Sequence, residues 1–310
     1  MTKRTYFIII SLLVALDIAT GFWYIAGHIN SDGNSDIFDS DHDEVTLADT
    51  ISSQSTPDRY EMVENNAYFV STMPAIAGNM RTYFASIKRI KSKVPTEING
   101  RTDVETLMAA VAEKAFPNSH GSLQAGIQMF LKTPSFNVKN LAYKVLDTAP
   151  TITAKYGNVQ GVRIYPIFTS RSYLVMAIAI TSYNGTNTSE KQYFVNYNRS
   201  THTVLHRHDI LAEGTDEKVL ELVNQKIGVL VDEASMPLHS ASRLSPEIYL
   251  RSKGIFFVYQ PGEVADATEG VIEIFVPFKS LQEHLTPSFR GLVVENADYC
   301  ELKPLAFNPE

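Results

Sequence analysis

A positively charged stub followed at once by a long apolar run opens this chain and limits what the rest of it can be. Lys3 and Arg4 precede an apolar run over residues 6–25. A helix needs about 20 apolar residues to cross the hydrocarbon core of a bilayer, and this run has that length. Positive charge on the short leading side favours a cytoplasmic start. We therefore predict that residues 1–27 form an N-terminal membrane anchor or an uncleaved signal.

A cleaved signal peptide is the main alternative to an anchor. The apolar part of such a signal usually spans about 7 to 15 residues and ends at a small-residue cleavage site. Here the run continues through Phe22, Trp23 and Tyr24, an aromatic cluster typical of a membrane interface. We expect the folded part to lie in the cell envelope, anchored in the cytoplasmic membrane on the extracytoplasmic side. A cleaved signal would make it secreted or periplasmic.

Residues 28–57 are rich in Asp, Ser and Asn and contain few large apolar side chains. Such a segment cannot bury enough apolar surface to fold alone. We predict a flexible acidic tether that holds the folded part away from the membrane. The acidic run at 39–43 lacks the spacing and the closing glutamate of an EF-hand, so a calcium loop is not predicted there.

The charge and cysteine content exclude some classes of protein. The net charge is −7 and no basic stripe is present, which argues against a nucleic-acid partner and favours a cationic one. The single cysteine, Cys300, cannot form an internal disulfide, so stability must come from packing. The part after the tether, about 250 residues, is long enough to bury a substantial core.

Strand and helix signals alternate through the remainder, which we divide into an N-terminal α+β lobe at 58–150 and a C-terminal α+β lobe at 151–310. In the first lobe we predict strands at 67–72 and 81–90, a turn at 95–100, a helix capped by Thr102 or Asp103 and ending near Ala115, and a second helix at 122–131. In the second we predict strands at 162–168, 173–183, 191–197, 248–250, 255–259 and 271–276, a helix after Leu211, and a short helix at 277–285. This order predicts an α+β fold, a curved antiparallel sheet with helices packed mainly on one face. We expect the two lobes to form one compact unit.

One stretch of the second lobe carries a family resemblance. Residues 248–285 contain a strand, a loop, a second strand and a helix start, in which these positions carry the pattern: Glu263, Val264, Ala265 and Gly270 in the loop, and Val276, Pro277, Phe278 and Leu281 at the helix start. The stretch resembles the closing module of a bacterial envelope family, a domain of unknown function. That family includes the extracellular domain of the lysozyme-sensing anti-sigma factor RsiV and the accessory N-terminal part of the peptidoglycan deacetylase PdaC. Residues 193–211 resemble the same family's strand, turn and Asp-Leu-Phe segment. The C-terminal lobe is thus RsiV-like.

Departures from the family pattern affect what the resemblance implies. Gly262, Asp266 and Ala267 stand where the family usually has Tyr, Pro and Tyr, so the loop lacks an aromatic surface. Five residues before the apolar run are too few for the cytoplasmic domain of an anti-sigma factor, and no deacetylase domain follows the module. We therefore expect a binding module without its usual effector.

The resemblance implies a ligand from the cell envelope, either peptidoglycan or a cationic wall-active protein such as lysozyme. The candidate ligand-binding residues are Tyr249, Tyr259, Glu263 and Phe278. The three aromatic side chains have two readings, because rings in a sheet either pack into the core or rim a groove for glycan or peptide. We predict no catalytic residue, no metal and no cofactor, and expect a non-catalytic binding domain.

A histidine cluster supports a different class of function. His206 and His208 would share one face of a strand, as two metal ligands do, and His202 and Asp209 lie nearby in sequence. A catalytic zinc site also needs a third convergent ligand, and no motif supplies it. The alternatives are therefore a metal-dependent hydrolase or deacetylase of cell-wall glycan, and a structural envelope protein without a small ligand.

Overall fold

The computed structural model describes residues 57–72, 75–77, 80–136, 140–150, 157–234, 237–295 and 299–301. All of these residues fall within one compact unit, Ile51–Leu305. The predicted anchor, and the predicted tether up to residue 56, lie outside the described residues. Among the helices that the structure describes, none has the length and hydropathy of a membrane span.

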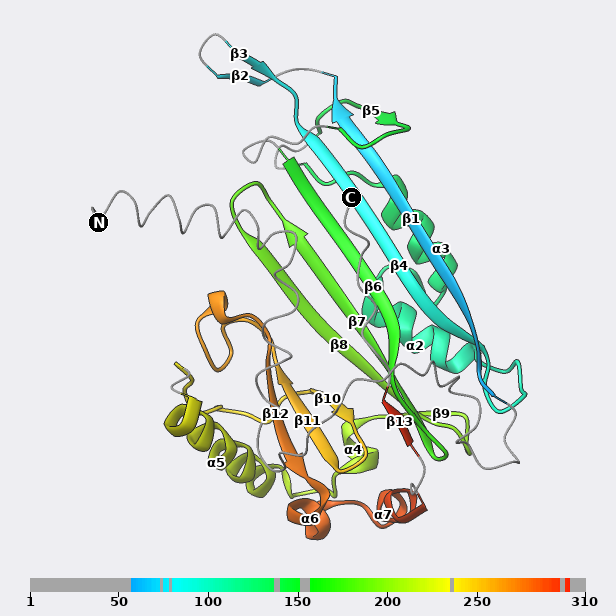
Figure 1. Cartoon of the computed structure of the whole chain (residues 1–310), viewed down its shortest axis with the longest axis vertical. Helices are drawn as coiled ribbons and strands as arrows, with labels where there is room; N and C mark the ends of the chain where they lie inside the picture. The colour runs from blue at the N-terminus through cyan, green and yellow to red at the C-terminus, as the bar shows by residue number, and fades with distance from the viewer. Residues whose placement is uncertain are drawn as a thin grey trace, which may run out of the picture. The chain divides into compact units, whose positions relative to one another are not determined.

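Strands and helices alternate along the described chain (Figure 1). The strands are β1 (Arg59–Ser71), β2 (Ala75–Ala77), β3 (Met80–Thr82), β4 (Ala85–Glu97), β5 (Tyr143–Leu146), β6 (Gly157–Ser170), β7 (Tyr173–Tyr183), β8 (Thr188–Asn198), β9 (Thr203–Leu205), β10 (Glu247–Leu250), β11 (Gly254–Tyr259), β12 (Ile272–Pro277) and β13 (Tyr299–Glu301). The helices are α2 (Glu105–Ala115), α3 (Leu123–Lys132), α4 (Arg207–Ile210), α5 (Asp216–Ala234), α6 (Phe278–Leu281) and α7 (Pro287–Glu295). The predicted α+β fold class is confirmed.

Strands from both predicted lobes lie in one eight-stranded sheet. Its order is β5-β1-β4-β6-β7-β8-β9, and β13 also pairs with β6. β10, β11 and β12 form a separate three-stranded sheet, and β2 pairs with β3. The expectation of an antiparallel sheet is wrong for one pair, since β4 and β6 run parallel. Parallel neighbours need a long crossover, and the segment between these two strands supplies one that contains α2, α3 and β5.

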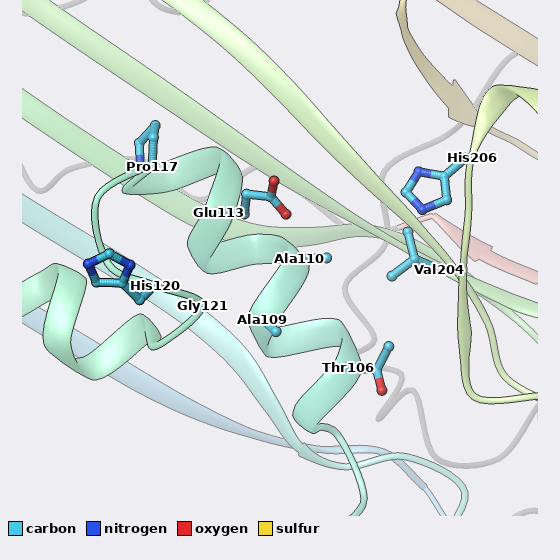
Figure 2. Close-up of a pocket in the computed structure, with 9 residues that line it drawn as sticks. All are labelled: Thr106, Ala109, Ala110, Glu113, Pro117, His120, Gly121, Val204 and His206. Carbon is cyan, nitrogen blue, oxygen red and sulfur yellow. The ribbon is translucent and has the colours of Figure 1, made fainter.

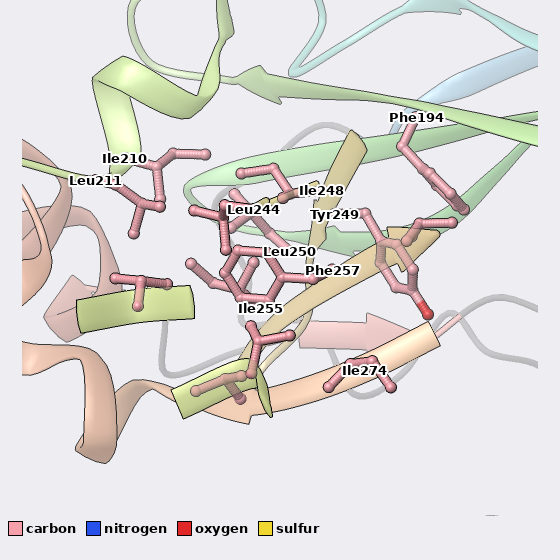
Figure 3. Close-up of a cluster of buried hydrophobic side chains, with 14 of the residues drawn as sticks. Phe194, Ile210, Leu211, Leu244, Ile248, Tyr249, Leu250, Ile255, Phe257 and Ile274 are labelled. Atoms are coloured by element: carbon pink, nitrogen blue, oxygen red, sulfur yellow. The ribbon is translucent and has the colours of Figure 1, made fainter. Parts of the chain in front are cut away.

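The central strands are apolar on both sides because both faces of the large sheet are covered. In β7, Leu174, Met176 and Ile178 belong to one hydrophobic cluster, which also contains buried residues of α2 and α3. The alternate residues Tyr173 and Val175 belong to a second cluster, shared with α5 and the three-stranded sheet (Figure 3). A strand buried on both faces reads as a continuous apolar run rather than an alternating one.

Local chemistry sets the ends of α2 and α3. The predicted capping of α2 by Thr102 or Asp103 is wrong, because Val104 occupies the N-cap position without a side-chain hydrogen bond. Ser122 does cap α3, since its hydroxyl accepts a hydrogen bond from the backbone N–H of Ala125 at 3.2 Å. The two helices approach closely, because a side chain at Gly126 would overlap the ring of Phe116.

The predicted turn at 95–100 is shorter in the structure, because β4 continues to Glu97. β4 pairs with β6 only as far as Ser92. Pro95 lies beyond that point, so no residue of β6 needs the backbone N–H that proline lacks. The turn follows at Asn99 and Gly100, which both adopt positive φ angles, 53° and 75°.

Candidate functional site

A hollow of about 560 Å³ runs along the exposed side of α2 (Figure 2). Four of its lining residues come from the helix, three from the turn after it, and two from β9 and the residue that follows. They are Thr106, Ala109, Ala110, Glu113, Pro117, His120, Gly121, Val204 and His206. The hollow is open to solvent and joins segments far apart in the sequence.

The spacing of residues along α2 explains this hollow. Residues 106, 109, 110 and 113 recur at intervals of three and four, so they form one stripe of the helix. That stripe faces away from the buried residues Leu107 and Val111. Two alanines in its middle leave space beside the helix that longer side chains would fill. At its end the chain turns through His120 and Gly121, which both have positive φ angles.

The hollow carries a few polar side chains that lie apart from one another. Glu113 supplies a carboxylate, and His120 and His206 supply imidazoles. Figure 2 shows the two imidazoles on opposite sides of α2, so they do not converge on one point. The nine lining residues include neither serine nor cysteine. The arrangement offers separated hydrogen-bonding groups along a shallow surface.

A second hollow, of about 470 Å³, lies on the other side of β9. It is lined by residues of the β8–β9 turn, β9, α4 and α7: Asn198, Thr201, Thr203, Val204, Leu205, His206, His208, Asp209, Ser288, Phe289 and Leu292. Val204 and His206 line both hollows. The two hollows therefore adjoin each other at β9.

The histidine cluster predicted from the sequence lies where the two hollows adjoin. Its geometry differs from the predicted one. His206 and His208 are not on a strand, because β9 ends at Leu205 and α4 begins at residue 207. Their rings stack with centroids 5.5 Å apart. The backbone N–H of His206 donates to Asp209 Oδ2 at 2.8 Å, which fixes the start of α4. Among the described residues no group of three or more His, Cys, Asp and Glu is placed to hold a metal ion.

The three aromatic candidates for ligand binding lie in the core rather than around a groove. Tyr249 is 3% exposed and stacks between Phe194 and Phe256, with centroids 4.4 Å and 4.7 Å away (Figure 3). Tyr259 and Phe278 are buried as well. The expectation that these rings rim a groove is therefore corrected. These rings are buried because the three-stranded sheet packs against the larger sheet, and the hydrophobic cluster that the two sheets share includes all three rings.

Glu263, the fourth candidate, is partly exposed and holds its own loop together. Its Oε2 accepts a hydrogen bond from the backbone N–H of Gln260 at 2.7 Å, and its Oε1 lies 3.2 Å from Arg243 Nη2. The next residues, Val264 and Ala265, are buried. This part of the family-like loop motif thus has a structural role.

A buried polar group accompanies Tyr249. The Tyr249 hydroxyl donates a hydrogen bond to Glu273 Oε2 at 2.8 Å. Burial raises the pKa of the Glu273 carboxyl, while the Tyr249 hydrogen bond and the nearby Arg251 oppose that rise. Burial likewise raises the pKa of Tyr249 well above its ordinary value. At neutral pH the tyrosine therefore remains a hydrogen-bond donor rather than a phenolate.

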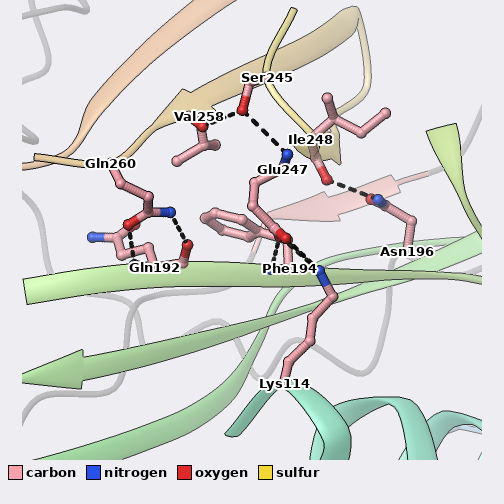
Figure 4. Close-up of polar contacts among 9 residues, drawn as sticks. All are labelled: Lys114, Gln192, Phe194, Asn196, Ser245, Glu247, Ile248, Val258 and Gln260. Carbon is pink, nitrogen blue, oxygen red and sulfur yellow. Dashed lines mark hydrogen bonds and ion pairs between the residues drawn. The ribbon is translucent and has the colours of Figure 1, made fainter. Parts of the chain in front are cut away.

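Side chains close the outer edge of β8 where β9 does not reach (Figure 4). β9 pairs only with residues 196–198. Before them, the Gln260 side chain accepts from the backbone N–H of Gln192 at 3.2 Å and donates to its carbonyl at 2.6 Å. The backbone N–H of Phe194 donates to Glu247 Oε2 at 3.3 Å, and Lys114 Nζ lies 2.7 Å from the same carboxylate. These contacts join α2, β8 and the three-stranded sheet, and no local sequence pattern predicts them.

Lys88 is a buried ammonium on the helix-covered face of β4. It is 3% exposed and lies 4.5 Å from the centroid of the Phe130 ring. Nζ donates to Ser135 Oγ at 2.7 Å and to Gln160 Oε1. Burial lowers its pKa from 10.5 to about 8. These bonds attach the segment after α3 to β4 and β6.

Comparison with known proteins identifies the fold and leaves the family open. No family model matches this chain, and no curated protein matches it. A solved structure of a DUF3298 family member from Bacteroides fragilis is similar, with a TM-score of 0.55 and 14% identity over 77% of this chain and 99% of that one. A DUF3298 family protein from Pseudomonas aeruginosa has a TM-score of 0.49 and 14% identity, over 76% of this chain and 98% of that one. The chain thus shares the fold of a domain of unknown function.

Proposed function

We propose that this chain is a non-catalytic binding domain of the cell envelope, tethered to the membrane by residues 1–27, which recognises an extracytoplasmic ligand. Its ligand is peptidoglycan or a cationic wall-active protein such as lysozyme. The observation that carries the proposal is the hollow along α2. An open groove with a floor of small side chains and separated polar groups suits a segment of a polymer or a protein surface.

The surroundings of the hollow support a binding role. Binding loses less free energy to ordering when the site is rigid before the ligand arrives. α2 meets this condition, because its inner face is packed on the large sheet and Lys114 in its last turn is bonded to Glu247 of β10. The groove is thus built on a fixed helix rather than on a mobile loop.

Charge and resemblance narrow the ligand class. The net charge of −7 speeds encounter with a cationic partner through electrostatic steering. The pattern in residues 248–285 resembles a family that includes a lysozyme sensor and an accessory part of a peptidoglycan deacetylase. The fold shared with a DUF3298 structure fits that resemblance at the level of architecture alone.

Isothermal titration calorimetry with lysozyme and with purified peptidoglycan fragments tests this proposal. The titrations use the full chain in detergent, at low and at physiological salt. We expect saturable binding to one of the two ligands that persists at physiological salt. Absence of heat with both would refute the proposed function.

A pair of matched variants tests the site. Ala109→Trp places an indole in the hollow from an exposed position, and Ala125→Trp makes the same change at an exposed position of α3. We expect the first to weaken binding at least about tenfold, the equivalent of 1.4 kcal/mol, and the second to leave it unchanged. Equal affinities for both variants would place the ligand elsewhere.

A further inference from the structure

Within the described part of the chain, the outer edge of β1 is open along most of its length. β1 pairs with β4 over nearly the whole strand, but on its other side β5 pairs only with Tyr68–Ser71. Figure 1 shows β1 at the border of the large sheet, with β5 beside only one end. No described strand pairs with the outer side of Glu61–Ala67. We call this stretch the β1 edge.

The two edges of the large sheet differ in whether side chains bond to their unpaired backbone groups. At the β8 border, Gln260 and Glu247 bond the backbone of residues that β9 leaves unpaired. Among the described residues, no side chain closes the β1 edge in this way. The β1 edge also contains no proline and no register shift, two devices that discourage a further strand from pairing.

Exposed apolar side chains occur at both ends of the same border. Five of the six large hydrophobic residues that are exposed in the described chain belong to β1, β5, α3 or the residue two before β4: Met62, Tyr83, Met129, Tyr143 and Val145. Met62, in the β1 edge itself, is 59% exposed. Met62 is thus an exposed apolar side chain on a stretch of edge strand that no described strand pairs with, which suits strand addition.

We propose that the β1 edge pairs antiparallel with the β1 edge of a second copy of this chain, joining two large sheets across a two-fold axis at Met62. A two-fold interface requires a surface that complements itself. With the axis at residue 62, Met62 faces its own copy, Glu61 faces Val63, and Glu64 faces Tyr60. No carboxylate then stands directly opposite another.

Neighbouring registers are less favourable, which is why the axis falls at this residue. An axis at residue 61 or at residue 64 would place Glu61 or Glu64 opposite its own copy, and like charges directly opposite destabilise a strand pair. An axis at Val63 would place Met62 opposite Glu64. The chosen register buries the exposed Met62 side chain against an apolar one.

Disulfide trapping in the full chain tests both the pairing and its register. Met62→Cys is made together with Cys300→Ser, which removes the native thiol. Residues that face each other across antiparallel strands lie within disulfide reach. We expect oxidation to convert most of this variant to a covalent dimer on a non-reducing gel.

Two cysteine controls in the same background separate specific pairing from random collision. Glu64→Cys lies on the same face of β1, but its two copies would be four residues apart along the strands, about 13 Å. Val229→Cys is an exposed position of α5, far along the chain from the β1 edge. Little dimer is expected from either control. No dimer at Met62, or equal dimer at all three positions, would overturn the proposal.

A non-covalent measurement checks the same surface without cysteines. Sedimentation equilibrium of the otherwise unchanged chain should give a dimer, and Met62→Lys should raise its dissociation constant at least about tenfold, because two ammonium groups would then face each other. Val229→Lys should leave the dimer intact. A monomeric parent chain, or equal effects of the two lysine variants, would overturn the proposal. If cysteine trapping joined the β1 edge to a different protein in place of a second copy, the proposal would also be overturned.

Discussion

Replacing the buried lysine of β4 should change how stability depends on pH. Lys88→Met keeps a long flexible side chain but removes the ammonium that burial holds at a pKa of about 8, against an ordinary value of 10.5. Because the folded-state pKa is depressed, the unfolded chain binds a proton between these values that the folded chain lacks. The lysine's contribution to stability is therefore complete above about pH 10.5 and is lost as pH falls through 8.

The size of this effect follows from the two pKa values. Their difference corresponds to about 3 kcal/mol at 1.4 kcal/mol per pKa unit. Screening by polar neighbours and solvent reduces the expected effect to about 2 kcal/mol. The free energy of unfolding of the wild type, measured relative to Lys88→Met, should thus rise by about 2 kcal/mol from pH 7 to pH 10.

Urea denaturation followed by circular dichroism at pH 7 and pH 10 measures this change. Comparing the two proteins at each pH cancels the titration of groups that they share. Lys144→Met is the control, because this lysine is exposed on β5, and its difference from the wild type should stay constant. If the Lys88→Met difference is equally constant, the account of Lys88 as a desolvated ammonium is refuted.

Three further substitutions test contacts within the three-stranded sheet and between it and α2, each by urea denaturation. Tyr249→Phe keeps the ring stack but leaves the Glu273 carboxylate without its hydroxyl donor, so a loss of about 1–3 kcal/mol is expected, and no loss would contradict this contact. Gly254→Ala would bring a Cβ to 2.4 Å from a backbone oxygen of β12 and should cost about 1–3 kcal/mol; an unchanged midpoint would show that the strands can separate. Lys114→Met should cost about 1 kcal/mol, and a double variant with Glu247→Gln should cost little more, because both changes break one ion pair. Additive losses would show that the two residues act independently.

Much of the architecture follows from local patterns in the sequence. Apolar spacing predicted α2, which buries Leu107 and Val111 against the large sheet. Dense β-branched and aromatic runs predicted β6, β7 and β8. The parallel pairing of β4 with β6 was missed, because the direction of a strand depends on the path of the intervening chain and not on its own residues.

The candidate site was harder to predict than the fold. Tyr249 has the same local sequence whether its ring packs in a core or lines a groove, and the approach of two sheets decides between these outcomes. The stripe from Thr106 to Glu113 could have been recognised as the polar side of a predicted helix. Its opposite side, at Val204 and His206, comes from β9 and the residue after it, about ninety residues later, which no spacing rule connects to α2.

Calorimetry of the full chain measures whether an envelope ligand binds at the hollow along α2. We predict a saturable signal with lysozyme or peptidoglycan fragments at physiological salt, weakened by Ala109→Trp and unchanged by Ala125→Trp. Absence of a heat of binding with both ligands would contradict the proposed function. Binding that both variants retain would contradict the assignment of the site.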